Sequence, residues 1–197
     1  EMRVESYMGA PLFDSSGRAL GLLSVMDDKP MDPSESMRSV LTIFAARAGA
    51  ELERREAEQA VRTSEERYRN LVDTAQDVIF TIAPDASLMS LNPAFETITG
   101  WKREDWLGKN FAPIVHPDDL VTAVDFFQRV LAGETASYEL RIKKACGNYL
   151  VGEFTSTPLI ERGIQIGAFG IARDITERKK AEDTIRDLAY HDVLTGL

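Results

Sequence analysis

The stretch Asn92-Pro93-Ala94-Phe95 opens a short helix in the middle of the chain, and Thr99-Gly100-Trp101 ends it. Proline is favoured at the first helical position and asparagine just before it, so we expect Asn92 to cap this helix. Gly100 is free to adopt the left-handed conformation that often follows a helix. The stretch therefore predicts a compact helical turn, and the segments on either side of it decide the fold.

Upstream of this helix, in chain order, the pattern predicts a hairpin, a long helix and two strands. The strands are Val78–Ile82 and Leu88–Leu91, joined by a turn at Pro84. Before them, apolar residues at three- and four-residue spacing and an absence of breakers predict one long helix, or two in tandem, over Ser36–Thr74. Ser34 is placed to cap it. The apolar runs Tyr7–Phe13 and Leu20–Met26, around an Asp-Ser-Ser-Gly turn, predict a hairpin.

Downstream, His116-Pro117-Asp118-Asp119 opens a longer helix that Gly133 closes. Three alternating segments then predict strands, and a charged helix follows over Glu177–Tyr190. The strands are Ser137–Ile142, Tyr149–Pro158 and Ile164–Asp174. Strands grouped around an insertion of helices are typical of an α+β fold.

Composition excludes several classes of function. Among 197 residues, 23 are Lys or Arg and 32 are Asp or Glu, for a net charge of −9. A chain this acidic is a poor match for general nucleic-acid or anionic-membrane binding. One cysteine cannot form an intrachain disulfide, and two histidines are too few for a typical zinc cluster. We expect no metal, no membrane contact, a cytoplasmic location and a piece of a longer protein.

The set of motifs resembles a PAS domain over residues 64–178. It consists of the helix at Asn92, the His116-Pro117-Asp118-Asp119 word and the final run Gly170-Ile171-Ala172-Arg173-Asp174-Ile175-Thr176-Glu177-Arg178. The resemblance implies an antiparallel sheet with helices on one face, and a sensor module in which the sheet and helices enclose either a packed core or a pocket for a small ligand. It also implies that the chain relays a signal to other domains.

Two flanking segments resemble parts of other signalling modules. Residues 1–56, with their hairpin and helix, are similar to the C-terminal end of a GAF domain, and 57–63 are a helical linker. Residues 189–197 are similar to the first residues of a GGDEF diguanylate cyclase domain, after a second linker at 179–188. The catalytic word of that family is absent, so we expect no catalytic residues and no activity in this chain.

Nine apolar residues are the candidate pocket, although their residue types fit a packed core better. They are Phe80, Ile82, Phe95, Ile98, Phe111, Phe127, Leu140, Phe154 and Phe169. Haem binding through His116 is disfavoured because this histidine fits a turn before a helix. Flavin photochemistry through Cys146 is disfavoured because this cysteine lies in a turn between strands. The cofactor, if any, stays unknown.

The exit motif is the candidate for signal coupling. Asp174 and Thr176 are placed to hydrogen-bond at the start of the last helix, with Thr176 as its cap, and Arg178 follows them. Ala181, Ile185 and Leu188 have the four-then-three spacing of a short coiled-coil seam. We therefore expect a homodimer through the flanking helices.

Three functions follow from the resemblance. In the first, the PAS segment regulates a downstream diguanylate cyclase, in which two cyclase domains each hold GTP and make cyclic di-GMP. In the second, it is a non-enzymatic dimerisation or interaction module. The third, a histidine-kinase sensor, ranks lowest because His191 lies beside Leu194-Thr195-Gly196, which is typical of a turn.

Overall fold

The computed structural model describes residues 4–32 and 34–195, and the chain divides into two compact units, Glu1–Tyr68 and Arg69–Leu197. The first unit is a hairpin of β1 (Ser6–Phe13) and β2 (Ala19–Asp27) against α1 (Glu35–Asp73). Both strands were predicted, and the long helix is a single one. Leu12, Leu41 and Ala45 are buried in this unit, so its apolar core is small.

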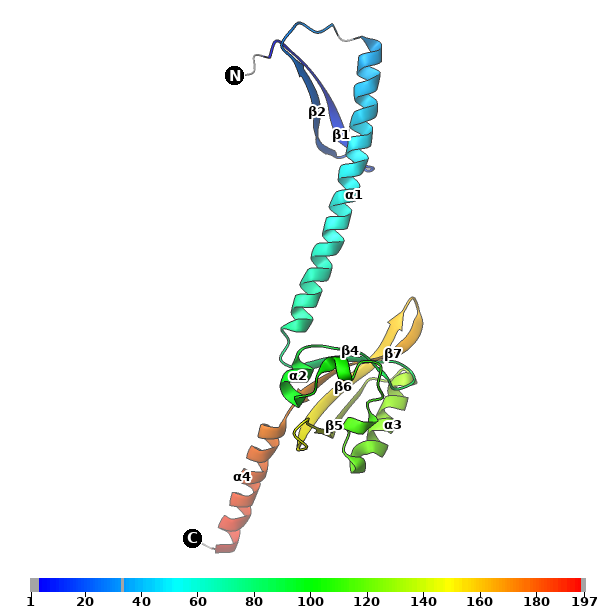
Figure 1. Ribbon diagram of the computed structural model, residues 1–197. Helices are drawn as coiled ribbons and strands as arrows, with labels where there is room; N and C mark the ends of the chain where they lie inside the picture. Colours follow the sequence, from blue (N-terminus) through cyan, green and yellow to red (C-terminus); the bar gives the residue numbers. More distant parts are fainter. Residues whose placement is uncertain (1–3, 33, 196–197) are drawn as a thin grey trace. The chain divides into compact units, whose positions relative to one another are not determined.

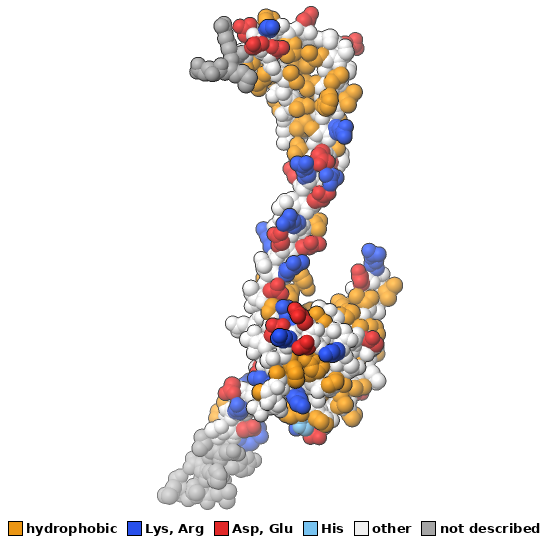
Figure 2. Space-filling model, in the orientation of Figure 1, with side chains coloured by type: hydrophobic (Ala, Val, Ile, Leu, Met, Phe, Trp, Pro, Cys, Tyr) orange, Lys and Arg blue, Asp and Glu red, His pale blue; other side chains and the backbone are white. Residues whose placement is uncertain are grey.

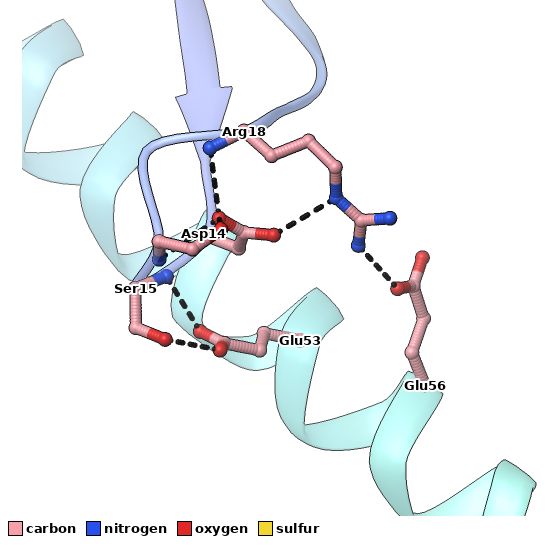
Figure 3. A network of polar contacts seen from close by, with 6 residues as sticks. Asp14, Ser15, Arg18, Glu53 and Glu56 are labelled. Atoms are coloured by element: carbon pink, nitrogen blue, oxygen red, sulfur yellow. Dashed lines mark hydrogen bonds and ion pairs between the residues drawn. The ribbon is translucent and has the colours of Figure 1, made fainter.

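The turn of the hairpin is held to α1 by a polar network (Figure 3). Asp14 accepts hydrogen bonds from the Ser16 and Arg18 amides at 3.0 and 2.9 Å. The Ser16 hydroxyl and the Arg18 amide hold the pKa of Asp14 at about 2. Ser15 donates from its amide and its hydroxyl to the Glu53 carboxylate of α1 at 3.0 and 2.5 Å. The turn therefore both orders itself and binds the helix.

Helix α1 begins as the sequence predicts. The Ser34 hydroxyl accepts a hydrogen bond from the Met37 amide at 3.2 Å, which is the geometry of an N-terminal cap. Figure 2 shows orange side chains gathered over the hairpin, and red and blue side chains interspersed along the helix beyond it. Pairs of opposite charge one turn apart, such as Arg55 with Glu51 at 3.0 Å, support this exposed part of the helix.

The second unit is a five-stranded antiparallel sheet with a layer of helices on one face (Figure 1). The strand order is β4-β3-β7-β6-β5. The strands are β3 (Val78–Ile82), β4 (Leu88–Leu91), β5 (Ala136–Lys143), β6 (Tyr149–Glu161) and β7 (Ile164–Asp174). The layer contains α2 (Ala94–Thr99), α3 (Leu120–Leu131) and three 3₁₀ turns, η1 (Arg103–Asp105), η2 (Ala112–Ile114) and η3 (Pro117–Asp119). The predicted α+β fold is confirmed.

The core of this unit lies between the sheet and the helices. Along β3, Val78, Phe80 and Ile82 are buried and alternate with half-buried residues, as expected for a strand with one face on the core. Phe127 and Val130 of α3 pack against the same cluster. The register pairs Val78 with Ala172, so the start of β3 lies beside the end of β7. The chain therefore enters and leaves this sheet at neighbouring strand ends.

The predicted cap at Asn92 is wrong. No side chain caps α2, whose N-terminal residue is flanked by Pro93, although Gly100 ends the helix in the predicted left-handed conformation. The Asn92 amide instead donates to the Val72 and Asp77 carbonyls at 3.0 and 2.9 Å, and its oxygen accepts from the Ile79 amide at 3.0 Å. Asn92 thus joins the end of α1 to the start of β3.

The last helix, α4 (Thr176–Thr195), begins one residue earlier than predicted and continues past the expected end at Tyr190. The side chains of the motif at 188–197, including His191, lie outside the part of the chain that the structure describes. None of the helices in the described part combines the length and apolar character needed to cross a membrane.

Candidate functional site

An apolar cavity of about 90 Å³ lies between the sheet and the helices of the second unit. It is built by the inward faces of the strands together with α2, α3 and the segment between them. Eight of the nine predicted pocket residues line it: Phe80, Ile82, Phe95, Ile98, Phe111, Phe127, Leu140 and Phe154. The tight core and the pocket, which the sequence left as alternatives, are here parts of one apolar cluster with a small internal space.

Phe169 does not line the cavity, and its place among the pocket residues is a correction. It lies on β7 between Ala168 and Gly170, which are both buried, and it is itself only half-buried. Because side chains alternate between the two faces of a strand, the apolar residues that line the cavity from β7 are Ala168 and Ala172, and Arg173 adds to the lining near the end of the strand. Phe169 pairs with Thr81 and Thr157 across the sheet and belongs to the other face.

Two polar side chains that sequence analysis missed also line the cavity. The Tyr138 hydroxyl and the Ser156 hydroxyl lie 3.1 Å apart and hydrogen-bond to each other. Burial raises the pKa of Tyr138, so this phenol stays neutral. Tyr138 lies two residues from Ala136 and from Leu140, which are both buried, so the three share one face of β5. Period-2 alternation along β5 was therefore the signal that could have placed Tyr138 inward.

Small residues on the sheet make room for the aromatic rings. A Cβ atom on Gly170 would collide with the ring of Phe80, and one on Gly152 would collide with the ring of Phe154. Both glycines are buried and lie beneath rings that line the cavity. The two rings meet edge to face, with centroids 6.1 Å apart. The glycines therefore set how deep the rings lie and, with them, the size of the cavity.

The chemistry of the lining favours binding of an apolar molecule over catalysis or metal ligation. Among the residues that the structure describes, no buried side-chain nitrogen or oxygen lacks a hydrogen-bond partner. Within residues 4–32 and 34–195, no three His, Cys, Asp or Glu residues gather as a metal site would require. An apolar cavity without orphaned polar atoms offers a ligand van der Waals contact and exclusion of water.

His116 and Cys146 lie away from this lining. The Nδ1 atom of His116 accepts a hydrogen bond from the Asp118 amide at 3.2 Å, at the start of η3. Its ring meets the ring of Tyr149 edge to face, with centroids 4.6 Å apart. Cys146 is exposed in the turn between β5 and β6. Neither residue is among those that line the cavity.

The exit motif connects the sheet directly to α4. The Asp174 carboxylate accepts hydrogen bonds from the amide and the hydroxyl of Thr176, at 2.9 and 2.5 Å. The Thr176 hydroxyl in turn accepts from the Val151 amide of β6 at 3.0 Å. Asp174, rather than Thr176, therefore satisfies the first amide of the helix. Arg178 contacts Glu153 of β6 at 3.2 Å, so all three predicted coupling residues meet at this joint.

Comparison with known proteins agrees with this architecture. The PAS fold family model matches residues 66–175, more than half of the chain. The methyl sulfide methyltransferase-associated sensor of Methanosarcina acetivorans is 28% identical over 173 residues, which cover 87% of this chain and 17% of the relative. The methanogenesis regulatory histidine kinase FilI of Methanothrix harundinacea is 32% identical over 124 residues, which cover 62% of this chain and 14% of the relative.

Solved structures show the same fold. The crystal structure of a PAS domain from Colwellia psychrerythraea matches with a TM-score of 0.53 and 22% identity, covering 57% of this chain and 97% of that one. The chain spans less than a fifth of the length of the two curated relatives. The likeness therefore describes one segment of larger proteins.

Proposed function

The chain belongs to the PAS fold family, and on that premise we propose that it is a sensor-and-relay segment of a larger signalling protein. One observation carries the proposal. Strand β7 lines the cavity through Ala168 and Ala172 and ends at Asp174, whose carboxylate starts α4. Only a few residues of β7 therefore separate the cavity from the start of α4, so a shift of this strand at the cavity can change the direction of the helix.

The relay works through the joint between β6, β7 and α4. A molecule in the cavity contacts β6 as well as β7, through Phe154 and Ser156. A shift between these two strands alters the hydrogen bond from Val151 to Thr176, because its two ends lie on β6 and at the start of α4. The helix then changes orientation or local order, and a domain attached to it responds. A ligand drives this change only as far as it binds the two arrangements with different affinity.

The ligand that suits the cavity is small, neutral and mostly apolar. The lining is mostly hydrocarbon, and its polar groups already have partners within the protein. Tyr138 and Ser156 hydrogen-bond to each other, Thr99 donates to the Phe95 carbonyl, and Arg173 pairs with Asp77. Burying a charge in such a site is costly. The volume of about 90 Å³ supports a molecule much smaller than haem or a flavin.

Benzene is a suitable probe of this cavity and of the relay. NMR titration of the full chain with benzene should give saturable shifts in cavity residues, such as Leu140, together with a shift of the Val151 amide. Ala123→Val, which adds methyl groups at a buried lining position, should weaken both, whereas Ala132→Val at an exposed position should not. Shifts in the cavity without any response at Val151 would contradict the relay.

The domain that receives the signal is proposed to be a diguanylate cyclase, on the strength of the motif at 189–197. The alternative receiver is a histidine kinase, and it gains support from the relative named as one. Sequencing the gene beyond Leu197 separates them: a Gly-Gly-Asp/Glu-Glu-Phe word favours the cyclase, and a dimerising helix with a phosphoacceptor histidine before an ATP-binding domain favours the kinase. With GTP, the chain alone should make no cyclic di-GMP.

Self-association through the flanking helices is part of the proposal. Val61, Tyr68 and Leu71 of α1 are exposed and follow each other at seven-then-three spacing, which suits a two-helix seam. The GAF-like hairpin unit would precede the PAS unit in such a dimer. A cytoplasmic location is also part of the proposal, because it suits a GTP-dependent output.

The dimer is tested by light scattering at high concentration, which should give the mass of two chains. Strong dimerisation with no ligand response would favour a purely structural interaction module.

A further inference from the structure

A row of charged side chains crosses the sheet where α1 ends and α4 begins. Its members come from four neighbouring segments: Asp77 just before β3, Arg173 on β7, Glu153 on β6 and Glu139 on β5. The register pairs Glu153 with Arg173 and Glu139 with Glu153. The Arg173 guanidinium contacts both oxygens of Asp77 at 2.8 to 3.2 Å. We call these four residues the charged row.

One pair within the charged row is unfavourable by itself. Glu139 and Glu153 are direct partners on adjacent antiparallel strands, and like charges at such positions destabilise a sheet. Arg173 is committed to Asp77 on its other side. The sheet therefore carries a carboxylate pair that its own strands only partly compensate.

The first turn of α4 supplies the missing positive charge. The Lys179 ammonium lies 2.8 Å from the Glu139 carboxylate, and the Arg178 guanidinium lies 3.2 Å from Glu153. Glu139 raises the pKa of Lys179, which keeps this ammonium charged. Each carboxylate of the unfavourable pair thus has its own cation from the same helical turn.

We propose that the charged row is a reversible electrostatic docking site for α4. When α4 is docked, Lys179 and Arg178 neutralise Glu139 and Glu153. When the helix leaves, the two carboxylates face each other with only the partial compensation that Arg173 gives, so release is opposed. All four side chains are 35 to 50% exposed, and exposed pairs of this kind shift an equilibrium by only about two- to fivefold each. These ion pairs therefore bias α4 toward the docked position without fixing it there.

The use of this docking site in signalling rests on the proposed relay, but its existence does not. The reporter is the Val151 amide, whose hydrogen bond to Thr176 holds only while the start of α4 lies on β6. Its hydrogen-exchange rate is measured by NMR on the full chain, without ligand or effector. The absence of a benzene response would therefore contradict the relay, whereas the absence of an effect on Val151 exchange in the charge variants would contradict the docking site.

The decisive experiment swaps the charges of Lys179 and Glu139 and follows the hydrogen exchange of the Val151 amide. Lys179→Glu and Glu139→Lys should each speed exchange at Val151 by about two- to fivefold, and the double variant should return it toward the wild-type rate. Lys180→Glu is the matched control, because Lys180 pairs with Glu177 on the same helix and not with the sheet. Raising the salt concentration from about 0.05 to 1 M should speed exchange in the wild type by screening these pairs.

Two results would overturn the docking site. One is a double variant whose Val151 amide exchanges as fast as in the single variants. The other is equal acceleration by Lys180→Glu, which would mean that any acidic charge on this turn has the effect. Tryptophan fluorescence checks that the PAS unit of each variant is still folded. Both tryptophans, Trp101 and Trp106, lie in that unit and report its unfolding.

Discussion

At the residue scale, Asn92 joins three stretches of backbone through one side chain. It is 2% exposed and hydrogen-bonds to Val72, Asp77 and Ile79. Asn92→Ala would leave the Asp77 carbonyl and the Ile79 amide without partners, and the Val72 carbonyl with only the Ala75 amide at 3.4 Å. Each unsatisfied buried group costs about 1–3 kcal/mol. We expect the PAS unit to lose about 2–4 kcal/mol of unfolding free energy, measured by urea titration followed by tryptophan fluorescence.

Asn148 provides the control for this substitution. It is exposed, and its backbone carbonyl accepts a hydrogen bond from the Lys144 amide in the β5–β6 turn. Asn148→Ala keeps that carbonyl, so the change in unfolding free energy should stay within about 0.5 kcal/mol. Equal losses at the two positions would show that the buried hydrogen bonds of Asn92 do not matter to stability.

Asp119 gives the PAS unit a defined dependence on pH. Hydrogen bonds from the Arg141 side chain, the closest at 2.6 Å, hold the pKa of Asp119 at about 2, below its usual 3.8. A depressed carboxyl pKa contributes stability above its unfolded value and loses it as the pH falls toward the folded value. We therefore expect the urea midpoint to fall between about pH 4 and pH 2, with Asp119→Asn showing a shallower fall.

The control for the pH experiment is Asp125→Asn, because Asp125 is an exposed residue of α3. Its substitution should leave the slope between pH 4 and pH 2 unchanged. If Asp119→Asn retained the full wild-type slope, the acid sensitivity would have to arise from other carboxylates, and the pair with Arg141 would carry no part of it.

At the element scale, Gly49 lets the hairpin approach α1 closely. A Cβ atom there would lie 2.5 Å from the backbone oxygen of Phe13, and backbone cannot move aside as a flexible side chain can. Gly49→Ala gains up to about 1 kcal/mol of helix propensity but incurs an overpacking cost of about 1–3 kcal/mol. We expect the hairpin to loosen, seen as faster amide exchange along β1 and β2.

Gly21→Ala is the matched control within the same unit. The nearest atom to a Cβ at Gly21 is Leu12 Cδ1 at 3.8 Å, an ordinary contact. This variant should exchange like the wild type. Faster exchange in both variants would point to a general sensitivity of the hairpin to added methyl groups, and unchanged exchange in Gly49→Ala would contradict the close approach.

Elements of this chain were predictable wherever one local period dominates. Alternation located β5 and β6, apolar runs beside turn residues located β3 and β7, and spacing with a serine cap located α1. The failures have non-local causes. Asn92 looks like a cap because of Pro93, but its partners lie 13 to 20 residues earlier in the chain. Phe169 looks like a core residue by type, and only the strand register shows which face it takes.

The candidate site was predictable in its apolar part for the same reason. Eight lining residues are large hydrophobics, and all of them except Phe111 lie on helices or strands. The Tyr138–Ser156 pair and the glycines beneath the rings were not predictable in this way, because their roles depend on which strands become neighbours. Residue type identifies the inside of a domain, whereas the shape of an internal space depends on tertiary pairing.

At the scale of the whole molecule, the two units differ sharply in how much apolar surface they bury. The hairpin unit has few buried hydrophobic residues, and a two-stranded sheet is marginal without further support. The PAS unit has a continuous core that spans five strands and the helices over them. Because burial is the main favourable term in folding, the two units should differ in unfolding free energy by several kcal/mol.

We therefore expect urea to unfold this chain in two steps. Circular dichroism at the helical band weighs the 39 residues of α1 heavily, whereas tryptophan fluorescence reports only the PAS unit. Helical signal should begin to fall at urea concentrations where fluorescence is still native. Coincident curves are the mark of a single cooperative transition. Their appearance here would mean that the hairpin unit draws its stability from the PAS unit.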